Sequence, residues 1–458
     1  MNNETIQRAL DMIETTIPEL MAEMKIPGLS IALVKDGEIL YAKGFGARDR
    51  ESNLPATSET LYGIGSCSKS FTALSVMQLV EKGEIGLHDP VSKYVPLKIR
   101  FQDKPITVHH LLSHSSGIPG LGTSTILRSA LPIPMSSFDD HYRFVNGAQD
   151  EIADEPGKKF FYLNAGYATL QDMVQKISKM RLDEYVEKNI LKPLGMKRCT
   201  YSKERFEKDP DAMTAYIRDK DGKPTPSKPV IHELLFGRGG LLCPVTELTN
   251  YLSANINKGK FKDIVLVSPD IMEDMHKIQI ETPRGWYGKQ GYGYGWSVIE
   301  DFLDRKVVMH GGSIMVSGGY LAFMPEEKVG VAMGYNMLGM PSQEFVLGLF
   351  ATLLGKEPEE AIPALKIRKK LKMLAGRYET YRGLSKAEVV YREGRLSFEQ
   401  DNEYGRTSVL LIPEDEKIEN YDFYTYSDGM KNPITFDVHS PEKIDLYIGI
   451  QRFHKIRG

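Results

Sequence analysis

The chain has 458 residues, more than one ordinary hydrophobic core organises, so we expect at least two domains. Hydrophobic residues make up 41% and charged residues 26%, as in a folded protein, and the formal net charge is only −3. This balance argues against a nucleic-acid-binding protein, which carries clustered Lys and Arg. No run approaches the roughly 18 consecutive apolar residues of a membrane-spanning helix, so we expect no membrane partner.

The compartment is predicted from the cysteines and the first residues. Cys67, Cys199 and Cys243 lie far apart and form no CxxC, which predicts neither a disulfide framework nor a zinc site. The opening stretch MNNETIQRALDMIETTIPEL is amphipathic and lacks the continuous apolar region of a signal peptide. We therefore expect a reducing, cytoplasmic location.

The first elements are clear from their patterns. Residues 3–24 predict a helix, and the two β-type runs that follow flank Asp36-Gly37, a strong hairpin signal. A helix is then expected from Ser66 to Gly83, with Gly83 as its C-terminal stop. This helix is apolar almost all round, so we expect it to be buried.

The rest of the first domain mixes helices with strands. Helical patterns, β-type runs and a closing helix are predicted at residues 164–179 and 245–258, at 306–310, 319–324 and 330–335, and at 342–354, respectively. Helices at both ends and strands between them indicate an α+β fold with an antiparallel sheet.

The composition changes after residue 355. Residues 356–370 are charged, contain two prolines and are typical of a linker. From residue 371 onward, short alternating runs are separated by turn signals, as in an all-β barrel or sandwich. We predict a first domain over 1–355, a linker over 356–370 and a small β-barrel over 371–458.

Ser66-Cys67-Ser68-Lys69 is an S-x-x-K sequence at the predicted start of the buried helix. Positions i and i+3 of a helix share a face, so the hydroxyl and the amine can meet. A serine nucleophile needs an adjacent base, and a lysine whose pKa is lowered by burial or a neighbouring cation can be that base. The structural alternative is a helix-capping serine. A second S-x-x-K, from Ser440 to Lys443, lies in the strand-rich tail and is interpreted as a surface turn.

Tyr162-Leu163-Asn164 is the only Y-x-N of the chain. A phenol near an ammonium ionises more easily and can then relay a proton to a leaving group. The amide two residues further on can hold a substrate amide or the lysine. The alternative is a tyrosine packed under a loop, followed by a helix-capping asparagine.

His310-Gly311-Gly312-Ser313 follows the β-like run RKVVM. Paired glycines let another backbone approach closely. The N–H of Ser313, beyond the glycines, can then be an oxyanion donor. The alternative is a turn at the end of a strand with a solvated histidine.

In this order, S-x-x-K, Y-x-N and H-G-G resemble the serine β-lactamase-like superfamily. The resemblance is to class C β-lactamases, D-amino peptidases of peptidase family S12, family VIII esterases and the CubicO group. Supporting stretches are IPGLSIALVKDGEILYAKGFG, ITVHHLLSHSSGIP, GRGGLLCPVTELTNYL, GYGYGW and HGGSIMVSGGYLAFMPEEKVGVAM. The resemblance covers about residues 5–355 and implies a β-lactamase/DD-peptidase-like domain.

The resemblance also implies a role for each residue. Ser66 becomes the acylated nucleophile, Lys69 the proton acceptor, and Tyr162 its partner and the proton donor to the leaving group. The implied substrate-binding and oxyanion positions are Asn164, His310, Gly311, Gly312 and Ser313, with the backbone N–H groups of Ser66 and Ser313 forming the oxyanion hole. Water then hydrolyses the acyl-enzyme, and no metal or other cofactor is needed.

One departure from the family pattern bears on the substrate. His310 stands where β-lactamases have the Lys of K-T-G, which helps to bind the substrate carboxylate. A largely neutral histidine binds a carboxylate less well, which favours peptidase or esterase action over strong β-lactamase action.

The whole arrangement is similar to archaeal CubicO-type serine peptidases. These carry a lipocalin-like C-terminal domain, act on peptides that contain D-amino acids and assemble as octamers that enclose the active sites. We therefore predict a homo-oligomeric serine hydrolase acting on small peptides, with the octamer as the implied assembly. The alternatives are a carboxylesterase, a weak β-lactamase and, in another class, a non-catalytic ligand-binding protein.

Two further groups of residues have mainly structural interpretations. The histidines of HHLLSH lack an acidic partner at ligand spacing, so we expect a structural helix and loop there rather than a metal site. The aromatic residues Trp286, Tyr292, Tyr294 and Trp296 either line a cleft or pack on the sheet. Cys67 is expected to be a packing residue.

Overall fold

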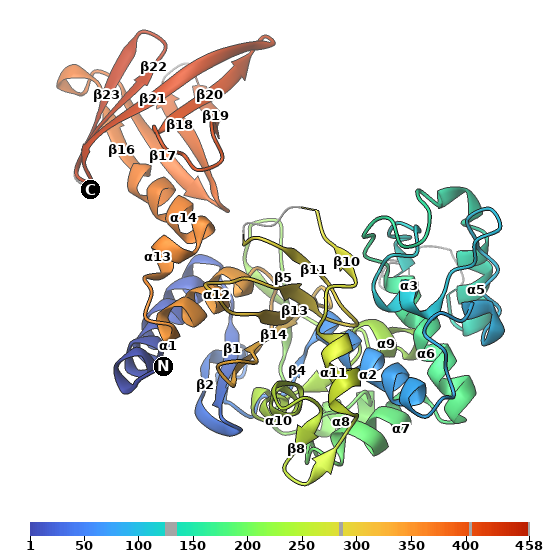
Figure 1. Ribbon diagram of the computed structural model, residues 1–458. Helices are drawn as coiled ribbons and strands as arrows, with labels where there is room; N and C mark the ends of the chain where they lie inside the picture. The colour runs from blue at the N-terminus through green and yellow to red at the C-terminus, as the bar shows by residue number, and fades with distance from the viewer. Residues whose placement is uncertain (124–134, 284–286, 403–404, 457–458) are drawn as a thin grey trace. The chain divides into compact units, whose positions relative to one another are not determined.

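The computed structural model describes residues 1–123, 135–283, 287–402 and 405–456 (Figure 1). The chain forms two compact units, Met1–Val346 and Leu347–Gly458. The boundary between them falls within helix α12 (Ser342–Leu353), the predicted closing helix.

The first unit is built on a nine-stranded antiparallel sheet with the order β10-β11-β12-β13-β14-β15-β1-β2-β3. The last three strands before the closing helix, β13, β14 and β15, confirm the three β-type runs predicted there. The strands are β1 (Gly28–Lys35), β2 (Glu38–Asp49), β3 (Leu54–Pro55), β10 (Ile280–Glu281), β11 (Gln290–Tyr292), β12 (Ser297–Ile299), β13 (Val307–Ser313), β14 (Gly318–Met324) and β15 (Val329–Tyr335). Because β15 pairs with β1, residues some 300 positions apart share one sheet.

The predicted hairpin at Asp36-Gly37 joins β1 to β2. Asp36 has φ of 52° and Gly37 has φ of 85°, the left-handed pair that a tight two-residue turn requires. The turn therefore pairs Lys35 with Glu38 and Val34 with Ile39, and a bulge shifts the register from Leu33 onward.

Helices surround the sheet, and α10 packs on β15 and β1. The predicted helices over 3–24, 164–179 and 245–258 are confirmed as α1, α6 and α10. Among the described residues before α12, the α-helices are α1 (Asn3–Glu23), α2 (Ser68–Glu81), α3 (Val108–Leu112), α5 (Phe138–Asn146), α6 (Asn164–Ser178), α7 (Leu182–Val186), α8 (Lys203–Lys208), α9 (Phe236–Gly239), α10 (Val245–Ile256) and α11 (Pro269–Met275). The described residues of this unit also form three two-stranded sheets: β4 (Tyr62–Gly63) with β7 (Leu242–Cys243), β5 (Ala215–Arg218) with β6 (Pro224–Ser227), and β8 (Lys260–Phe261) with β9 (Ile264–Val265).

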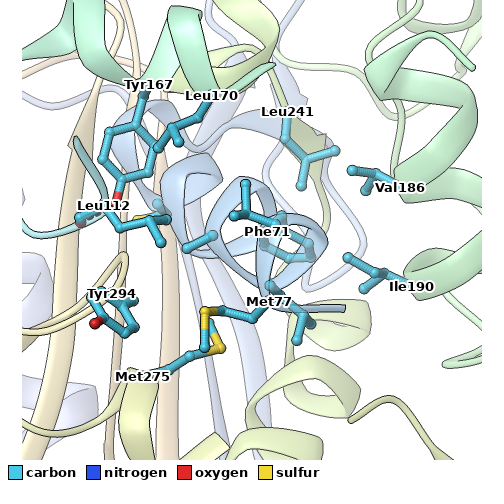
Figure 2. Packing of buried hydrophobic residues seen from close by; sticks show 14 of the residues in the cluster. Phe71, Met77, Leu112, Tyr167, Leu170, Val186, Ile190, Leu241, Met275 and Tyr294 are labelled. Carbon is cyan, nitrogen blue, oxygen red and sulfur yellow. Dashed lines mark hydrogen bonds between the residues drawn. The ribbon is translucent and has the colours of Figure 1, made fainter. Parts of the chain in front are cut away.

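Helix α2 is the centre of the core. It follows a 3₁₀ turn, Gly65–Cys67, and every residue from Ser68 to Leu79 is buried. Figure 2 shows Phe71 and Met77 of this helix enclosed by side chains from several other segments, namely Leu112, Tyr167, Leu170, Val186, Ile190, Leu241, Met275 and Tyr294. The Phe71 ring stacks on Tyr251 with the ring centroids 3.8 Å apart. A helix held on all sides keeps its first turn in a fixed place.

The prediction for the cysteines was wrong in one respect. Cys199 and Cys243 form a disulfide, with their Cα atoms 4.3 Å apart. The backbones of Thr200 and Leu242 exchange two hydrogen bonds of 2.9 Å, which brings the two cysteines together although 44 residues separate them. Spacing along the chain does not reveal such a pair. Cys67 is a buried free thiol.

The segment expected to be a linker is largely helical. Pro358 and Pro363 are the first residues of α13 (Pro358–Ala361) and α14 (Pro363–Leu374). Proline is well suited to that position because the first turn of a helix needs no N–H donor there. The prolines that were interpreted as linker residues therefore start helices. Leu371 and Leu374 of α14 belong to the core of the second unit.

The second unit contains the predicted barrel. Eight strands close into an antiparallel barrel in chain order, β16 to β23, and β16 pairs with β23. They are β16 (Gly376–Glu379), β17 (Lys386–Arg392), β18 (Arg395–Asn402), β19 (Gly405–Pro413), β20 (Asp422–Ser427), β21 (Met430–Ser440), β22 (Lys443–Ile448) and β23 (Gln451–Lys455). Side chains such as Phe398, Phe436 and Phe453 fill the interior, and the Phe398 and Phe453 rings are 5.5 Å apart. The barrel is thus a packed core.

The second S-x-x-K forms the turn between β21 and β22. The backbone N–H of Lys443 donates to Ser440 Oγ at 3.2 Å, so this serine closes a surface turn as predicted. Among the described residues, no helix is both long and apolar enough to cross a membrane.

Candidate active site

The 3₁₀ turn that carries Ser66 leads directly into the first turn of α2, which carries Lys69, so the hydroxyl and the amine meet. Lys69 Nζ donates to Ser66 Oγ at 2.9 Å and to the carbonyl oxygen of Arg238, in α9, at 2.7 Å. Lys69 is fully buried, whereas Ser66 is partly exposed. A backbone carbonyl therefore holds the amine in place, and the serine that carries the hydroxyl is partly exposed to solvent.

The tyrosine of Y-x-N lies beside this pair. The ring of Tyr162, from the loop before α6, has its centroid 4.8 Å from Lys69 Nζ. Burial raises the pKa of Tyr162, and a hydrogen bond with Ser66 only partly opposes this rise. The sequence suggested a phenol that ionises easily beside an ammonium, but desolvation outweighs that effect. Tyr162 is thus protonated at neutral pH and has a proton to donate.

The end of β13 packs against the start of the same helical segment. A Cβ on Gly65, whose φ is 54°, would lie 2.2 Å from the backbone nitrogen of Ser313. A Cβ on Gly312 would lie 1.8 Å from the carbonyl oxygen of Ile64 and 2.8 Å from the backbone nitrogen of Ser66. Only glycine at both positions allows the two backbones to approach so closely. The backbone of Gly312 and Ser313 therefore lies directly against the segment from Ile64 to Ser66.

The imidazole of His310 is buried and engaged at both nitrogens. Its Nδ1 donates to the carbonyl oxygen of Gly311 at 2.7 Å, and its Nε2 accepts from Tyr292 Oη at 2.9 Å. Burial lowers the pKa of His310 to about 3, with a further contribution from the charge of Lys69. The ring is therefore neutral at pH 7, and no cation stands at this position of the strand.

Asn164 is the first residue of α6 and is half-buried. Its side chain therefore starts close to Tyr162 in the chain, but its contact with Lys69 stays a prediction. The structure thus places Ser66, Lys69 and Tyr162 together, with the 310–313 segment beside them.

Two aromatic residues near the site were not assigned from the sequence. The sequence allows Tyr292 to line a cleft or to pack on the sheet, and in the structure its hydroxyl binds His310 directly. The ring of His114 lies 4.3 Å from the ring of Tyr162, and the HHLLSH sequence gave only a structural signal for it. Trp296 packs in the core, 5.5 Å from Phe323, and Trp286 lies outside the described residues.

The other two histidines of HHLLSH have separate partners. His109 Nδ1 lies 2.8 Å from Tyr294 Oη, and His110 Nδ1 accepts from the backbone N–H of Thr107 at 3.1 Å. Each imidazole therefore has a local hydrogen bond of its own.

A buried amine is bonded to a partly exposed serine, and a phenol lies beside the amine. This is a site of the serine-hydrolase type on an α+β fold. Residues 13–350 match the family model described as beta-lactamase, and residues 358–454 match that of the Pab87 octamerisation domain. The chain belongs to the beta-lactamase family, whose fold is that of serine hydrolases.

Individual relatives agree with this assignment. The structure of the octameric penicillin-binding protein homologue from Pyrococcus abyssi is 39% identical and has a TM-score of 0.87, with 97% of this chain and 100% of that chain covered. EstCE1, a hydrolase with promiscuous acyltransferase activity, is 21% identical with a TM-score of 0.63, over 76% of this chain and 98% of EstCE1, and shows the fold alone.

Protein flp of Staphylococcus aureus (strain MW2) is 28% identical over 329 residues, which are 71% of this chain and 62% of flp. The chain thus spans less than two thirds of the length of that relative.

Proposed function

We propose that this protein is a serine hydrolase that forms an acyl-enzyme at Ser66. The observation that carries the proposal is the 2.9 Å hydrogen bond between Lys69 Nζ and Ser66 Oγ, with the Tyr162 ring 4.8 Å from the same amine. A hydroxyl bonded to a buried amine has the partner that a serine nucleophile needs.

The first chemical step is attack by Ser66 Oγ on the carbonyl carbon of the substrate. The serine proton passes to Lys69 Nζ as the new C–O bond forms and the carbonyl oxygen becomes an oxyanion. Burial favours the neutral form of an amine, and a neutral amine has the lone pair that can accept the proton of the serine hydroxyl. The carbonyl of Arg238 keeps the amine in place during the transfer.

The second step expels the leaving group. Tyr162 donates its phenolic proton to the departing amine or alkoxide and recovers a proton from Lys69, so the proton taken from Ser66 leaves with the product. The raised pKa of Tyr162 supports the role of acid rather than base. Water then attacks the acyl carbon by the reverse sequence and frees Ser66.

The oxyanion is assigned to the backbone N–H groups of Ser66 and Ser313. The first nitrogen lies at the start of a helical segment, where N–H groups lack an intrahelical partner. The close contact through Gly65 and Gly312 supports this assignment, because it brings the backbone of Ser313 against the segment that carries Ser66.

Small peptides are the proposed substrates, including those with D-amino acids. The neutral, buried His310 supports a substrate without a carboxylate at this position of the strand, since a cation would otherwise be expected there. The same observation favours ester hydrolysis as the second candidate and disfavours strong β-lactamase activity.

The test is a panel of D- and L-aminoacyl p-nitroanilides, p-nitrophenyl esters and a chromogenic cephalosporin. We expect the anilides to be turned over best, and a fluorophosphonate probe to add its mass to Ser66 in the wild type but not in Ser66→Ala. Equal behaviour of the two proteins would reject the proposal. Binding of ligands without any turnover would instead support the non-catalytic alternative.

The proposed assembly is an octamer held by the C-terminal barrel. The match to the Pab87 octamerisation domain over 358–454 supports it. Light scattering should give an octamer for the full chain and a smaller species after deletion of residues 358–458. An unchanged number of subunits per assembly after the deletion would contradict this role. A cytoplasmic location stays a prediction from the sequence.

A further inference from the structure

His114 carries an unexplained set of contacts next to the proposed acid. It follows α3, it is 1% exposed, and its φ of 57° is left-handed. The turn that holds it is anchored from outside, because the backbone N–H of Gly157 donates to the carbonyl of Ser115 at 2.7 Å. A polar residue in an unusual backbone conformation, buried in a fixed turn, points to a specific role.

The contacts of His114 clamp the backbone on both sides of Tyr162. The carbonyl oxygen of His114 accepts from the N–H of Phe161 at 2.8 Å, and its ring Nδ1 accepts from the N–H of Leu163 at 3.1 Å. Main chain and side chain of one residue therefore hold both neighbours of the tyrosine.

The imidazole also packs on the tyrosine itself. Its ring centroid lies 4.3 Å from that of Tyr162, 4.8 Å from that of Tyr292 and 5.0 Å from that of Tyr167. Tyr292 in turn binds His310, so the ring of His114 lies between the loop before α6 and the strands of the H-G-G segment.

The clamp requires a neutral ring. A protonated Nδ1 carries a hydrogen and cannot accept from Leu163. Burial lowers the pKa of His114 well below its usual range, with a further contribution from Lys69. Because Nδ1 accepts, the ring proton is on Nε2, an atom that is buried and has no hydrogen-bond partner among the described residues.

We propose that His114 is a positioning residue that acts through Tyr162, holding the phenol beside Lys69 and Ser66 without touching the reacting atoms. The inference rests on the proposed function for its effect on rate, but the position of Tyr162 is independent of activity. Displacing a catalytic group by about 1 Å can cost about a hundredfold in rate.

Two substitutions separate the parts of the clamp. His114→Asn keeps an acceptor near the place of Nδ1 and tolerates a positive φ, whereas His114→Leu removes the acceptor and fills part of the space. We expect His114→Leu to lower kcat about 30-fold with little change in KM, and His114→Asn to stay within about fivefold of the wild type. Equal losses in both variants would overturn the acceptor role.

A double-mutant cycle with Tyr162→Phe tests whether the effect passes through the phenol. If it does, His114→Leu changes the rate less than about twofold in the Tyr162→Phe protein, because the proton donor is already gone. A loss that multiplies with that of Tyr162→Phe would overturn the inference, including the case in which His114→Leu only weakens the fold.

A crystal structure of the full-length His114→Leu protein gives a readout that needs no substrate. We expect Tyr162 to be displaced from Lys69, and a phenol that keeps its wild-type place would overturn the inference. Lack of turnover and of Ser66 labelling in the wild type would reject the proposed function instead, so the two failures are distinguishable.

Discussion

The two units of this chain differ in the polar side chains that they bury. In the first unit, Lys69, His114, His276 and His310 all have buried side chains. In the described part of the barrel, the buried charged side chain is Asp445, and the residues that bind it, such as Arg452, are half exposed.

This difference in buried polar side chains indicates which unit carries the reactive groups. Burying a polar group costs free energy unless it is hydrogen-bonded, so a fold keeps such groups where they have a function or a full set of partners. In the first unit, Lys69 bonds Ser66, and the rings of His114 and His310 lie beside Tyr162, whereas His276 bonds Asn255. In the barrel, Asp445 joins neighbouring strands and the interior is apolar, as expected of a scaffold.

The two S-x-x-K sequences are the sharpest way to test this contrast. Ser66→Ala or Lys69→Met should lower kcat/KM about a thousandfold or more, because each removes a partner of the same hydrogen bond. Ser440→Ala and Lys443→Met are the matched controls in the barrel turn and should keep wild-type rates. A comparable loss of kcat/KM in these controls would contradict the assignment of activity to Ser66 and Lys69 alone.

Apolar packing should matter equally in both units. Phe71→Ala and Phe398→Ala each remove a buried ring, at 0% and 4% exposure, and should each cost about 3–5 kcal/mol of unfolding free energy. Urea unfolding followed by circular dichroism measures this. A cost below about 1 kcal/mol for Phe398→Ala would contradict a packed barrel interior.

The two units should differ again in a glycine exchange. Gly65→Ala places a Cβ 2.2 Å from Ser313 N at a φ of 54°, so we expect a loss of about 2 kcal/mol in stability and about a hundredfold in kcat/KM. Gly394→Ala, at a φ of 79° with no atom within 4 Å, should cost about 1 kcal/mol and leave the rate unchanged. Full activity of Gly65→Ala would contradict the proposed oxyanion site.

The pH dependence of stability should come from the first unit at mildly acidic pH. Burial lowers the pKa of His276 to about 3, below its value in the unfolded chain, so its contribution is complete above about pH 6.5 and is lost as pH falls toward 3. Between pH 7 and 5 this loss is at most about 2 kcal/mol for one histidine. His276→Gln, which keeps a donor for Asn255, should flatten the change of Tm with pH.

Asp445 of the barrel should contribute nothing over that interval. Burial of Asp445 is outweighed by hydrogen bonds from Arg452, His454 and His439, which bring its pKa to about 2. The stability from this lowered pKa is present above about pH 4 and is lost only as pH falls toward 2. An unchanged slope in His276→Gln, measured by calorimetry, would contradict the contribution assigned to His276.

Local patterns in the sequence predicted most of the elements and the contact between Ser66 and Lys69. The Asp36-Gly37 turn, the apolar α2 and the alternating strands of the tail depend on neighbouring residues, so they are legible without coordinates. Likewise, the helix itself brings residues i and i+3 together, which is why Ser66 and Lys69 were found from four letters.

Contacts between distant segments were decided by the packed fold. The Cys199–Cys243 bond, the raised pKa of Tyr162 and the clamp by His114 each need two segments to meet and water to leave. Desolvation and backbone-to-backbone approach have no counterpart in a string of residues, because both arise only once the core has closed.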